Sequence, residues 1–171
     1  VAALSRIGAV PAMVREDAPA HELERSAELV DAQHWLGDPE HASVFAEAGC
    51  KRMLVLGGGP DRDVEVKGAV DLEALDIDGI EWPADYTPNP GVGGELALVF
   101  FTPSRRDPGG LRAAHITGRR WAMSALGAAT ACSLTPDDTV YMPLPLHHIG
   151  GLVVSAGGAL VGGARLAMAE E

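Results

Sequence analysis

Hydrophobic and polar positions follow two different periods along this chain, and these periods predict helices and strands in turn. Residues 20–30 place apolar side chains on one face of a helix and charged side chains on the opposite face. Continuous apolar runs at 52–56 and 96–102 predict buried strands, and the run at 96–102 has the strongest pattern. Strands that alternate with helices predict an α/β fold, in which helices flank a parallel or mixed sheet.

Shorter elements complete the predicted order. Asp38 and Pro39 have the residue types of an N-cap and a first helical position, so a helix is predicted from there to Ala48. Residues 61–81 fit either a short helix or a strand. The remaining predicted elements are strands at 10–14, 33–36, 139–142 and 164–168, helices at about 117–132 and 149–161, and a turn-rich loop at 103–110.

Charge divides the chain into two parts. Residues 1–94 carry 18 acidic and 7 basic side chains, whereas residues 95–171 carry 6 of each. A stretch rich in proline and glycine, residues 83–94, separates them. We therefore expect an acidic α/β lobe at 1–94 and a neutral, glycine-rich lobe at 95–171, both parts of one truncated domain. The net charge of -11 excludes a protein whose basic face binds nucleic acid.

Composition narrows the class further. A chain of 171 residues that is 47% hydrophobic can bury a sizeable core, and no apolar run is long enough for a transmembrane helix. Cys50 and Cys132 form no disulfide framework, and no Cys/His spacing predicts a metal site, so a cytoplasmic location is expected. The chain begins at Val1 within a predicted helix and stops at Glu171 after a strand-like run. We expect it to be a fragment of a longer polypeptide.

A glycine-rich turn, Gly57–Gly59, follows the predicted strand at 52–56. Such a turn can bring backbone N–H groups to a phosphate, but the dinucleotide pattern requires a glycine where Arg62 stands. Asp61 and Asp63 would also repel a bound anion. A structural turn is the favoured interpretation, and a nucleotide site here is the weaker alternative.

Residues 99–115, VFFTPSRRDPGGLRAAH, resemble the phosphate loop of adenylate-forming enzymes, whose pattern is Y-T-S-G-T-T-G-x-P-K-G. Pro108 and Gly110 match that pattern, and Thr102 takes the place of its serine. Ala114-His115 falls on the Thr-His that opens the next helix in the family. The resemblance implies a candidate phosphate-binding set that consists of Thr102, Ser104, Arg105, Arg106 and Gly110.

Residues 139–169 resemble the next block of the same family, a strand that ends in L-P-L-[FY]-H-x-x-G-L. His148, Gly151 and Leu152 match this block, and His147 stands in its aromatic position. The resemblance implies an acyl or adenylate site at His148, Gly150 and Gly151. The alternative is that His148 only caps the helix that starts at Ile149. No residue is singled out as catalytic, and His147 with His148 does not predict a metal site.

The resemblance covers nearly the whole chain, loosely over 1–95 and specifically over 96–169, and its later part is similar to fatty acyl-CoA synthetases. It implies part of the large N-terminal domain of an enzyme that activates a fatty acid with ATP to acyl-AMP and then to acyl-CoA. The implied co-substrates and cofactors are ATP, Mg²⁺ and CoA. The implied partners are a fatty acid and the remainder of its own polypeptide.

The candidate loop departs from the family at the positions that bind phosphate. Pro103 and Arg106 replace its two glycines, Gly109 replaces its lysine, and the only lysines in the chain are Lys51 and Lys67. Loss of one preorganised donor raises a reaction barrier by about 2.7–4 kcal/mol. Two hypotheses follow: a fragment of a long-chain fatty acyl-CoA synthetase that is inactive alone, or a non-catalytic acyl-binding or interaction scaffold. Both require the segments 99–115 and 139–152 to face one cleft.

Overall fold

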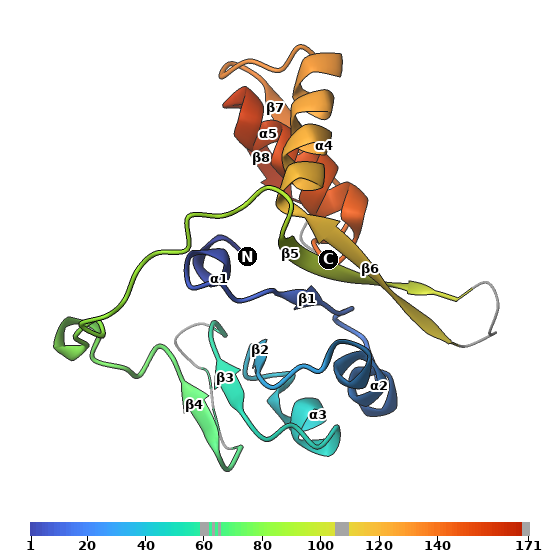
Figure 1. The fold of residues 1–171 in the computed structure, drawn as a ribbon. Helices are drawn as coiled ribbons and strands as arrows, with labels where there is room; N and C mark the ends of the chain where they lie inside the picture. The colour runs from blue at the N-terminus through green and yellow to red at the C-terminus, as the bar shows by residue number, and fades with distance from the viewer. Residues whose placement is uncertain (59–61, 63, 65, 105–109, 169–171) are drawn as a thin grey trace. The chain divides into compact units, whose positions relative to one another are not determined.

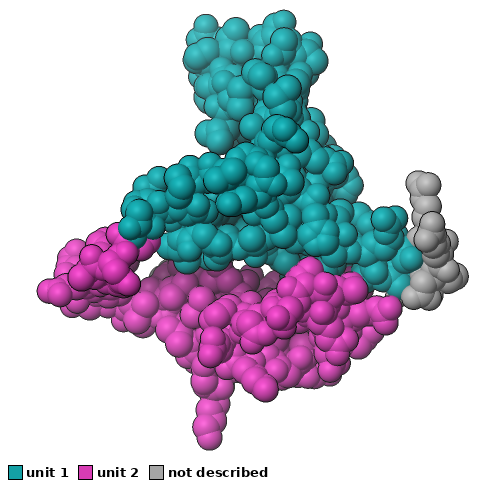
Figure 2. Space-filling model, viewed as in Figure 1, with its two compact units in different colours: residues 1–15, 87–171 teal, residues 16–86 magenta. Residues whose placement is uncertain are grey.

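The computed structural model describes residues 1–58, 62, 64, 66–104 and 110–168. Helices flank both parallel and antiparallel strands, so the predicted α/β class is confirmed (Figure 1). The chain separates into two units, which Figure 2 shows in teal and magenta. Unit 1 contains Val1–Arg15 and Thr87–Glu171, and unit 2 contains Glu16–Tyr86.

Unit 1 is built on a three-stranded sheet in the order β1-β5-β6. β1 (Ala12–Met13) runs parallel to β5 (Leu96–Pro103), which forms an antiparallel hairpin with β6 (Leu111–Thr117). The first helix, α1 (Ala2–Arg6), belongs to the same unit. Because β1 pairs with β5, residues 1–15 belong to the same unit as the second half of the chain. The two units therefore meet at residues 15–16 and 86–87, whereas the charge pattern of the sequence placed a single boundary after residue 94.

The two units of the structure differ more in net charge than the two parts of the sequence on either side of residue 94. Unit 1 contains 8 basic and 6 acidic residues, whereas unit 2 contains 5 basic and 18 acidic residues. The formal net charges are therefore +2 and -13. The unit that carries the two candidate segments is thus the unit without an excess of acidic residues.

A helical layer completes unit 1. Its elements are α4 (Gly118–Ala131), the π-helix η2 (Gly150–Ala156), α5 (Gly157–Gly162) and the parallel strands β7 (Thr139–Met142) and β8 (Arg165–Met168). Leu98, Phe100 and Ile116 of the hairpin form a buried cluster with Val153 of η2. Apolar burial of these side chains therefore holds η2 against the hairpin.

Small residues let the helices α4 and α5 approach closely. A Cβ atom added at Gly157 would lie 3.0 Å from the Cβ of Ala125, and one added at Gly158 would lie 3.0 Å from the Cβ of Ala128. Larger side chains at these positions would force the two helices apart.

Unit 2 has a parallel sheet in the order β2-β3-β4. Its elements are α2 (Ala20–Val30), β2 (Trp35–Gly37), α3 (Ala42–Glu47), β3 (Met53–Val55), β4 (Ala69–Asp71) and the 3₁₀ helix η1 (Ile77–Gly79). Leu23 of α2, Phe45 of α3 and Val55 of β3 are buried. The Phe45 ring lies 5.3 Å from that of Trp35, between ring centroids.

Two sequence predictions are wrong at their boundaries. The helix predicted from Asp38 begins at Ala42, because the Asp38 carboxylate accepts a hydrogen bond from the His41 N–H at 3.0 Å and holds residues 38–41 in a turn. His115 does not open a helix, since it pairs with Val99 in β6. The N-cap of α4 is Thr117, whose side chain accepts a hydrogen bond from Arg120 N–H.

The pair of Asp38 and His41 predicts a dependence of stability on pH. Asp38 Oδ1 lies 2.6 Å from His41 Nδ1, and this hydrogen bond raises the pKa of His41 above its ordinary 6.5. Burial acts to raise the pKa of Asp38, but the hydrogen bonds from His41 lower it below its ordinary 3.8. His41 therefore contributes stability below pH 6.5 that is lost as pH rises through its folded pKa, and Asp38 contributes stability above pH 3.8 that is lost as pH falls through its own.

An NMR titration of the His41 ring checks this prediction. We expect its midpoint above 6.5 in the native chain and lower in Asp38→Asn, which removes the negative charge and keeps the side-chain size. Equal midpoints in the two proteins would contradict the assigned cause.

Candidate functional site

The end of the β5–β6 hairpin carries the first candidate segment. Pro103 pairs with Leu111, and Ser104 N–H donates a hydrogen bond to the carbonyl of Gly110 at 2.7 Å. Thr102 is exposed and Gly110 is buried. Arg105 and Arg106, the other two members of the predicted phosphate-binding set, lie outside the described residues.

Strand register decides which hairpin side chains share a face. Thr102 pairs with Arg112, and Phe100 pairs with Ala114. Alternate residues of a strand share a face, as do residues that pair directly across an antiparallel ladder. Thr102 and Arg112 therefore lie on the face whose Phe100 packs against Val153 of η2. They are about 7 Å further along the hairpin, at roughly 3.4 Å per residue.

Arg112 is a residue that the sequence analysis missed. Residues 111–117 were expected to lead into the helix, but they form β6 and place Arg112 opposite Thr102. The sequence does contain a sign of the hairpin. A Gly-Gly pair, residues 109–110, lies between the apolar strand and a run of seven residues that ends at Thr117. A loop that contains glycine between two such runs is typical of a hairpin.

The second candidate segment connects β7 to η2 and is held together by His148. The ring Nδ1 accepts a hydrogen bond from Gly150 N–H at 3.0 Å, and the His148 carbonyl accepts one from Leu152 N–H at 3.1 Å. His148 N–H donates to the carbonyl of Pro145 at 3.0 Å. These contacts are the ones expected if His148 caps the start of the helix, which is the alternative to a role in the acyl site. Because Nδ1 accepts, the neutral ring carries its proton on Nε2, and the side chain is exposed.

Gly150 and Gly151 give this segment room for close backbone contacts. A Cβ atom added at Gly150 would lie 3.1 Å from His148 Nδ1, and one added at Gly151 would lie 2.8 Å from the carbonyl oxygen of Leu144. The two glycines thus allow η2 to start directly against the turn that precedes it. A role for them in an acyl site stays a prediction.

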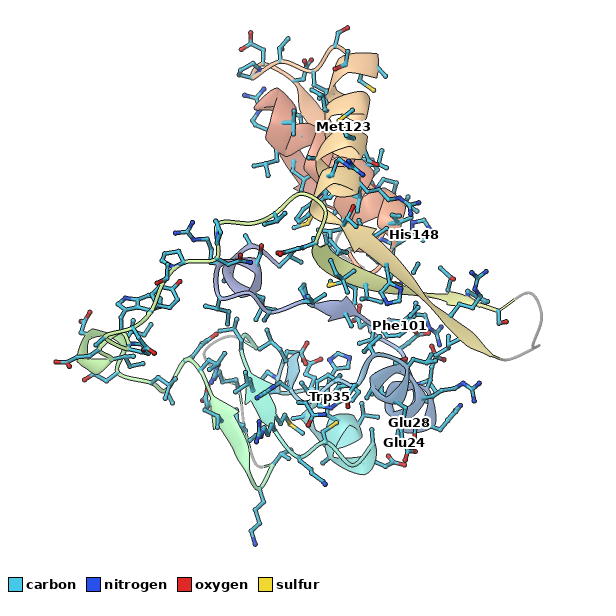
Figure 3. All side chains as sticks on the ribbon, in the orientation of Figure 1. Glu24, Glu28, Trp35, Phe101, Met123 and His148 are labelled. Atoms are coloured by element: carbon cyan, nitrogen blue, oxygen red, sulfur yellow. The ribbon has the colours of Figure 1, made fainter. Side chains whose placement is uncertain are left out.

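The two candidate segments meet through the core of unit 1. Ile149 and Leu152, which flank the start of η2, pack against the cluster formed by Leu98, Phe100, Ile116 and Val153. In Figure 3, His148 lies on the side of the hairpin that η2 and α4 occupy, and Phe101 lies on the other side. His148, Thr102 and Arg112 are therefore on the same side of the hairpin. That they line one cleft stays a prediction.

The glycine-rich turn after β3 is occupied by side chains of this chain. Gly57 N–H donates to Glu73 Oε1 at 2.8 Å, and the Gly57 carbonyl accepts from Arg62 Nη1 at 3.0 Å. Arg62 also forms ion pairs with Asp71 and with Glu73. A backbone N–H that binds a carboxylate is not open to a phosphate. These contacts favour the structural turn over the nucleotide site.

The described residues show neither a cluster of metal ligands nor a helix that could cross a membrane. No group of three or more His, Cys, Asp or Glu in that part of the chain could hold a metal ion. Within the same residues, no helix combines the length and the apolar character needed to cross a membrane.

No protein-family model and no curated protein matches the chain. Solved structures do match it over most of its length. Apo MatB from Rhodopseudomonas palustris has 20% identity and a TM-score of 0.72, over 97% of this chain and 31% of that one. The long-chain-fatty-acid-CoA ligase FadD1 from Archaeoglobus fulgidus has 20% identity and a TM-score of 0.66, over 97% and 31%.

The anthranilate CoA ligase AuaEII, solved with anthranoyl-AMP, has 13% identity and a TM-score of 0.77, over 94% of this chain and 30% of that one. These likenesses show the fold: the chain has the architecture of part of the domain found in adenylate-forming acyl- and aryl-CoA ligases. The chain spans about a third of the length of these solved proteins.

A glycine substitution tests the close approach in the second segment. In Gly151→Ala the new methyl group would meet backbone carbonyls that cannot move without shifting the turn, so we expect the free energy of unfolding to fall by about 1–3 kcal/mol. The matched control is Gly127→Ala on the exposed face of α4, where an added Cβ meets nothing within 4 Å.

Alanine at position 127 should instead stabilise the helix by about 0.5–1 kcal/mol. Urea unfolding measures both effects. A Gly151→Ala protein as stable as the Gly127→Ala protein would contradict the packing described for this turn.

Proposed function

We propose that this chain forms part of the ATP- and acyl-binding domain of an adenylate-forming ligase whose substrate is a long-chain fatty acid. The single observation that carries the proposal is the fold likeness over 97% of the chain. The polar end of the hairpin and His148, on the same side of the sheet, also support it. Relatives of this fold have been solved with ATP and with an acyl-adenylate.

In the proposed reaction a carboxylate oxygen of the acid attacks the α-phosphorus of ATP, the acyl-AMP bond forms and pyrophosphate leaves. The hydroxyl group of Thr102, exposed at the hairpin end, donates a hydrogen bond to a phosphate oxygen. Arg105 and Arg106, which lie outside the described residues, are predicted from the sequence to add positive charge to this phosphate site. His148 is oriented by the bond from Gly150 N–H to Nδ1, which leaves Nε2–H to donate to the acyl carboxylate.

The altered loop favours a second candidate function, a non-catalytic scaffold that binds an acyl group or a partner. Pro103 has no N–H to donate, and glycine at 109 replaces the lysine of the family pattern. The absence of one such donor slows a reaction by roughly two to three orders of magnitude. A ligase with this loop would therefore be slow, and a scaffold would keep acyl binding without turnover.

Several finer features of the proposal are predictions. They are the specificity for a fatty acid, the use of CoA and Mg²⁺, a cytoplasmic location, and a requirement for the remainder of a longer polypeptide. The fold likeness supports the requirement for a longer polypeptide, because this chain matches only about 31% of the length of each ligase chain. We therefore expect the 171-residue chain to bind ligand and to show no ATP–pyrophosphate exchange by itself.

Thermal unfolding in the presence of ligands tests the proposed function. A non-hydrolysable palmitoyl-adenylate analogue at 100 times its dissociation constant should stabilise the chain by about 2.7 kcal/mol, and NAD should not stabilise it. If palmitate stabilises the chain as much as the palmitoyl-adenylate analogue does, the adenylate part contributes nothing to binding. That result would favour the scaffold. Stabilisation by NAD alone would move the site to the turn at Gly57 and contradict the proposal.

Two threonine substitutions test whether the ligand binds at the end of the hairpin. Thr102→Val removes the hydroxyl at the hairpin end without a change in size, so we expect it to reduce the stabilisation by the analogue. Thr130→Val is the matched control, on the exposed surface of α4. Its ligand response should equal that of the native chain. Equal responses of the two variants would exclude Thr102 from the binding site.

A further inference from the structure

Within the described part of the hairpin β5–β6, Arg112 is the one arginine or lysine. It is exposed, and it pairs directly with Thr102 near the end of the ladder. Side chains paired in this way have Cβ atoms about 4.5–5.5 Å apart. None of the described residues forms a hydrogen bond or an ion pair with its side chain. A guanidinium group and a hydroxyl group are thus side by side on one face of the hairpin. The same face packs against η2 at Phe100, two residues before Thr102.

The surrounding charge favours an anion at this place. Unit 1 has 8 basic and 6 acidic residues, in contrast to the strongly acidic unit 2. Between Glu95 and Asp137 the sequence holds a single acidic residue, Asp107, and five arginines. An anion that approaches the hairpin end therefore meets little local negative charge from its own segment.

We propose that Arg112 is the cationic group that binds phosphate oxygens at this hairpin, in the role that the lysine of the family loop pattern would fill. The proposal rests on the proposed function and assigns its polyphosphate contact to a residue outside the loop pattern. A guanidinium group can donate two parallel hydrogen bonds to one phosphate, whereas an ammonium group acts as a point charge. Thr102 then donates to the same phosphate from the neighbouring strand.

Arg120 provides a matched control. It is exposed in the first turn of α4, beyond the other end of β6, and its N–H donates to the Thr117 hydroxyl. Five residue steps along β6, from Arg112 to Thr117, separate Arg112 from the start of α4 by roughly 17 Å of strand. Arg120→Gln therefore removes the same charge from the same unit without altering the hairpin end.

Calorimetric titration with inorganic pyrophosphate tests the proposal on the 171-residue chain. We expect Arg112→Gln to weaken binding by about tenfold or more, since a charge-assisted contact is lost. Arg112→Lys should bind with an intermediate affinity, because it keeps the charge and loses the paired geometry. Arg120→Gln should change the affinity by less than about twofold. Urea unfolding of each variant shows whether the fold is kept.

Each contrary result has a defined meaning. If Arg112→Gln binds pyrophosphate as tightly as the native chain, or if Arg112→Gln and Arg120→Gln weaken it equally, the assignment to Arg112 is overturned and the proposed function stands. If the native chain binds the palmitoyl-adenylate analogue but not pyrophosphate, the assignment is likewise overturned. If it binds neither, the proposed function fails as well.

Discussion

The packing of η2 against the β5–β6 hairpin is the contact on which the candidate site depends. Phe100 and Val153 are both almost completely buried in this contact, and burial of such a side chain stabilises a fold by about 1.5–3 kcal/mol. The hairpin residues beyond Phe100 extend past this core and carry Thr102 and Arg112. The turn that precedes η2 carries His148. One apolar cluster therefore holds both polar segments on the same side of the sheet.

Close backbone contacts around η2 add a second constraint. The turn from Pro145 to Gly150 is closed by hydrogen bonds that involve the His148 main chain and ring. Gly151 meets backbone carbonyls on one side, and Gly157 meets α4 on the other. Glycines at both ends let a π-helix lie in a narrow space. π-Helices are rare and are found frequently at functional sites, which agrees with the role proposed for this segment.

Local patterns predicted much of the fold. The amphipathic helix α2 was predicted with the bounds Ala20–Val30, and the apolar run that forms β5 was predicted within one residue of its observed end. β6 was not predicted, because alanine, arginine and histidine have little strand propensity and are held in β6 by pairing with β5. The pairing of β1 with β5 joins residues far apart in sequence, so a charge count along the chain could not find it.

Local sequence patterns supply candidates for the site but not the contacts between them. The loop pattern makes Ser104 and Gly110 candidates, and the structure adds the hydrogen bond between them. The second pattern makes His148 a candidate, but its contact with Gly150 depends on the three-dimensional turn. Arg112 belongs to neither pattern, and only strand register reveals its position opposite Thr102. Chemistry that depends on pairing across strands is not visible in local sequence.

The most direct test of this account is a map of amide chemical-shift changes in a two-dimensional NMR spectrum of the chain titrated with ATP. We expect changes at Thr102 and Arg112 in the hairpin and at His148 before η2, and no change at Gly57. Changes confined to one of the two segments, changes centred on Gly57, or the absence of any change would contradict the claim that one face of the hairpin binds the nucleotide.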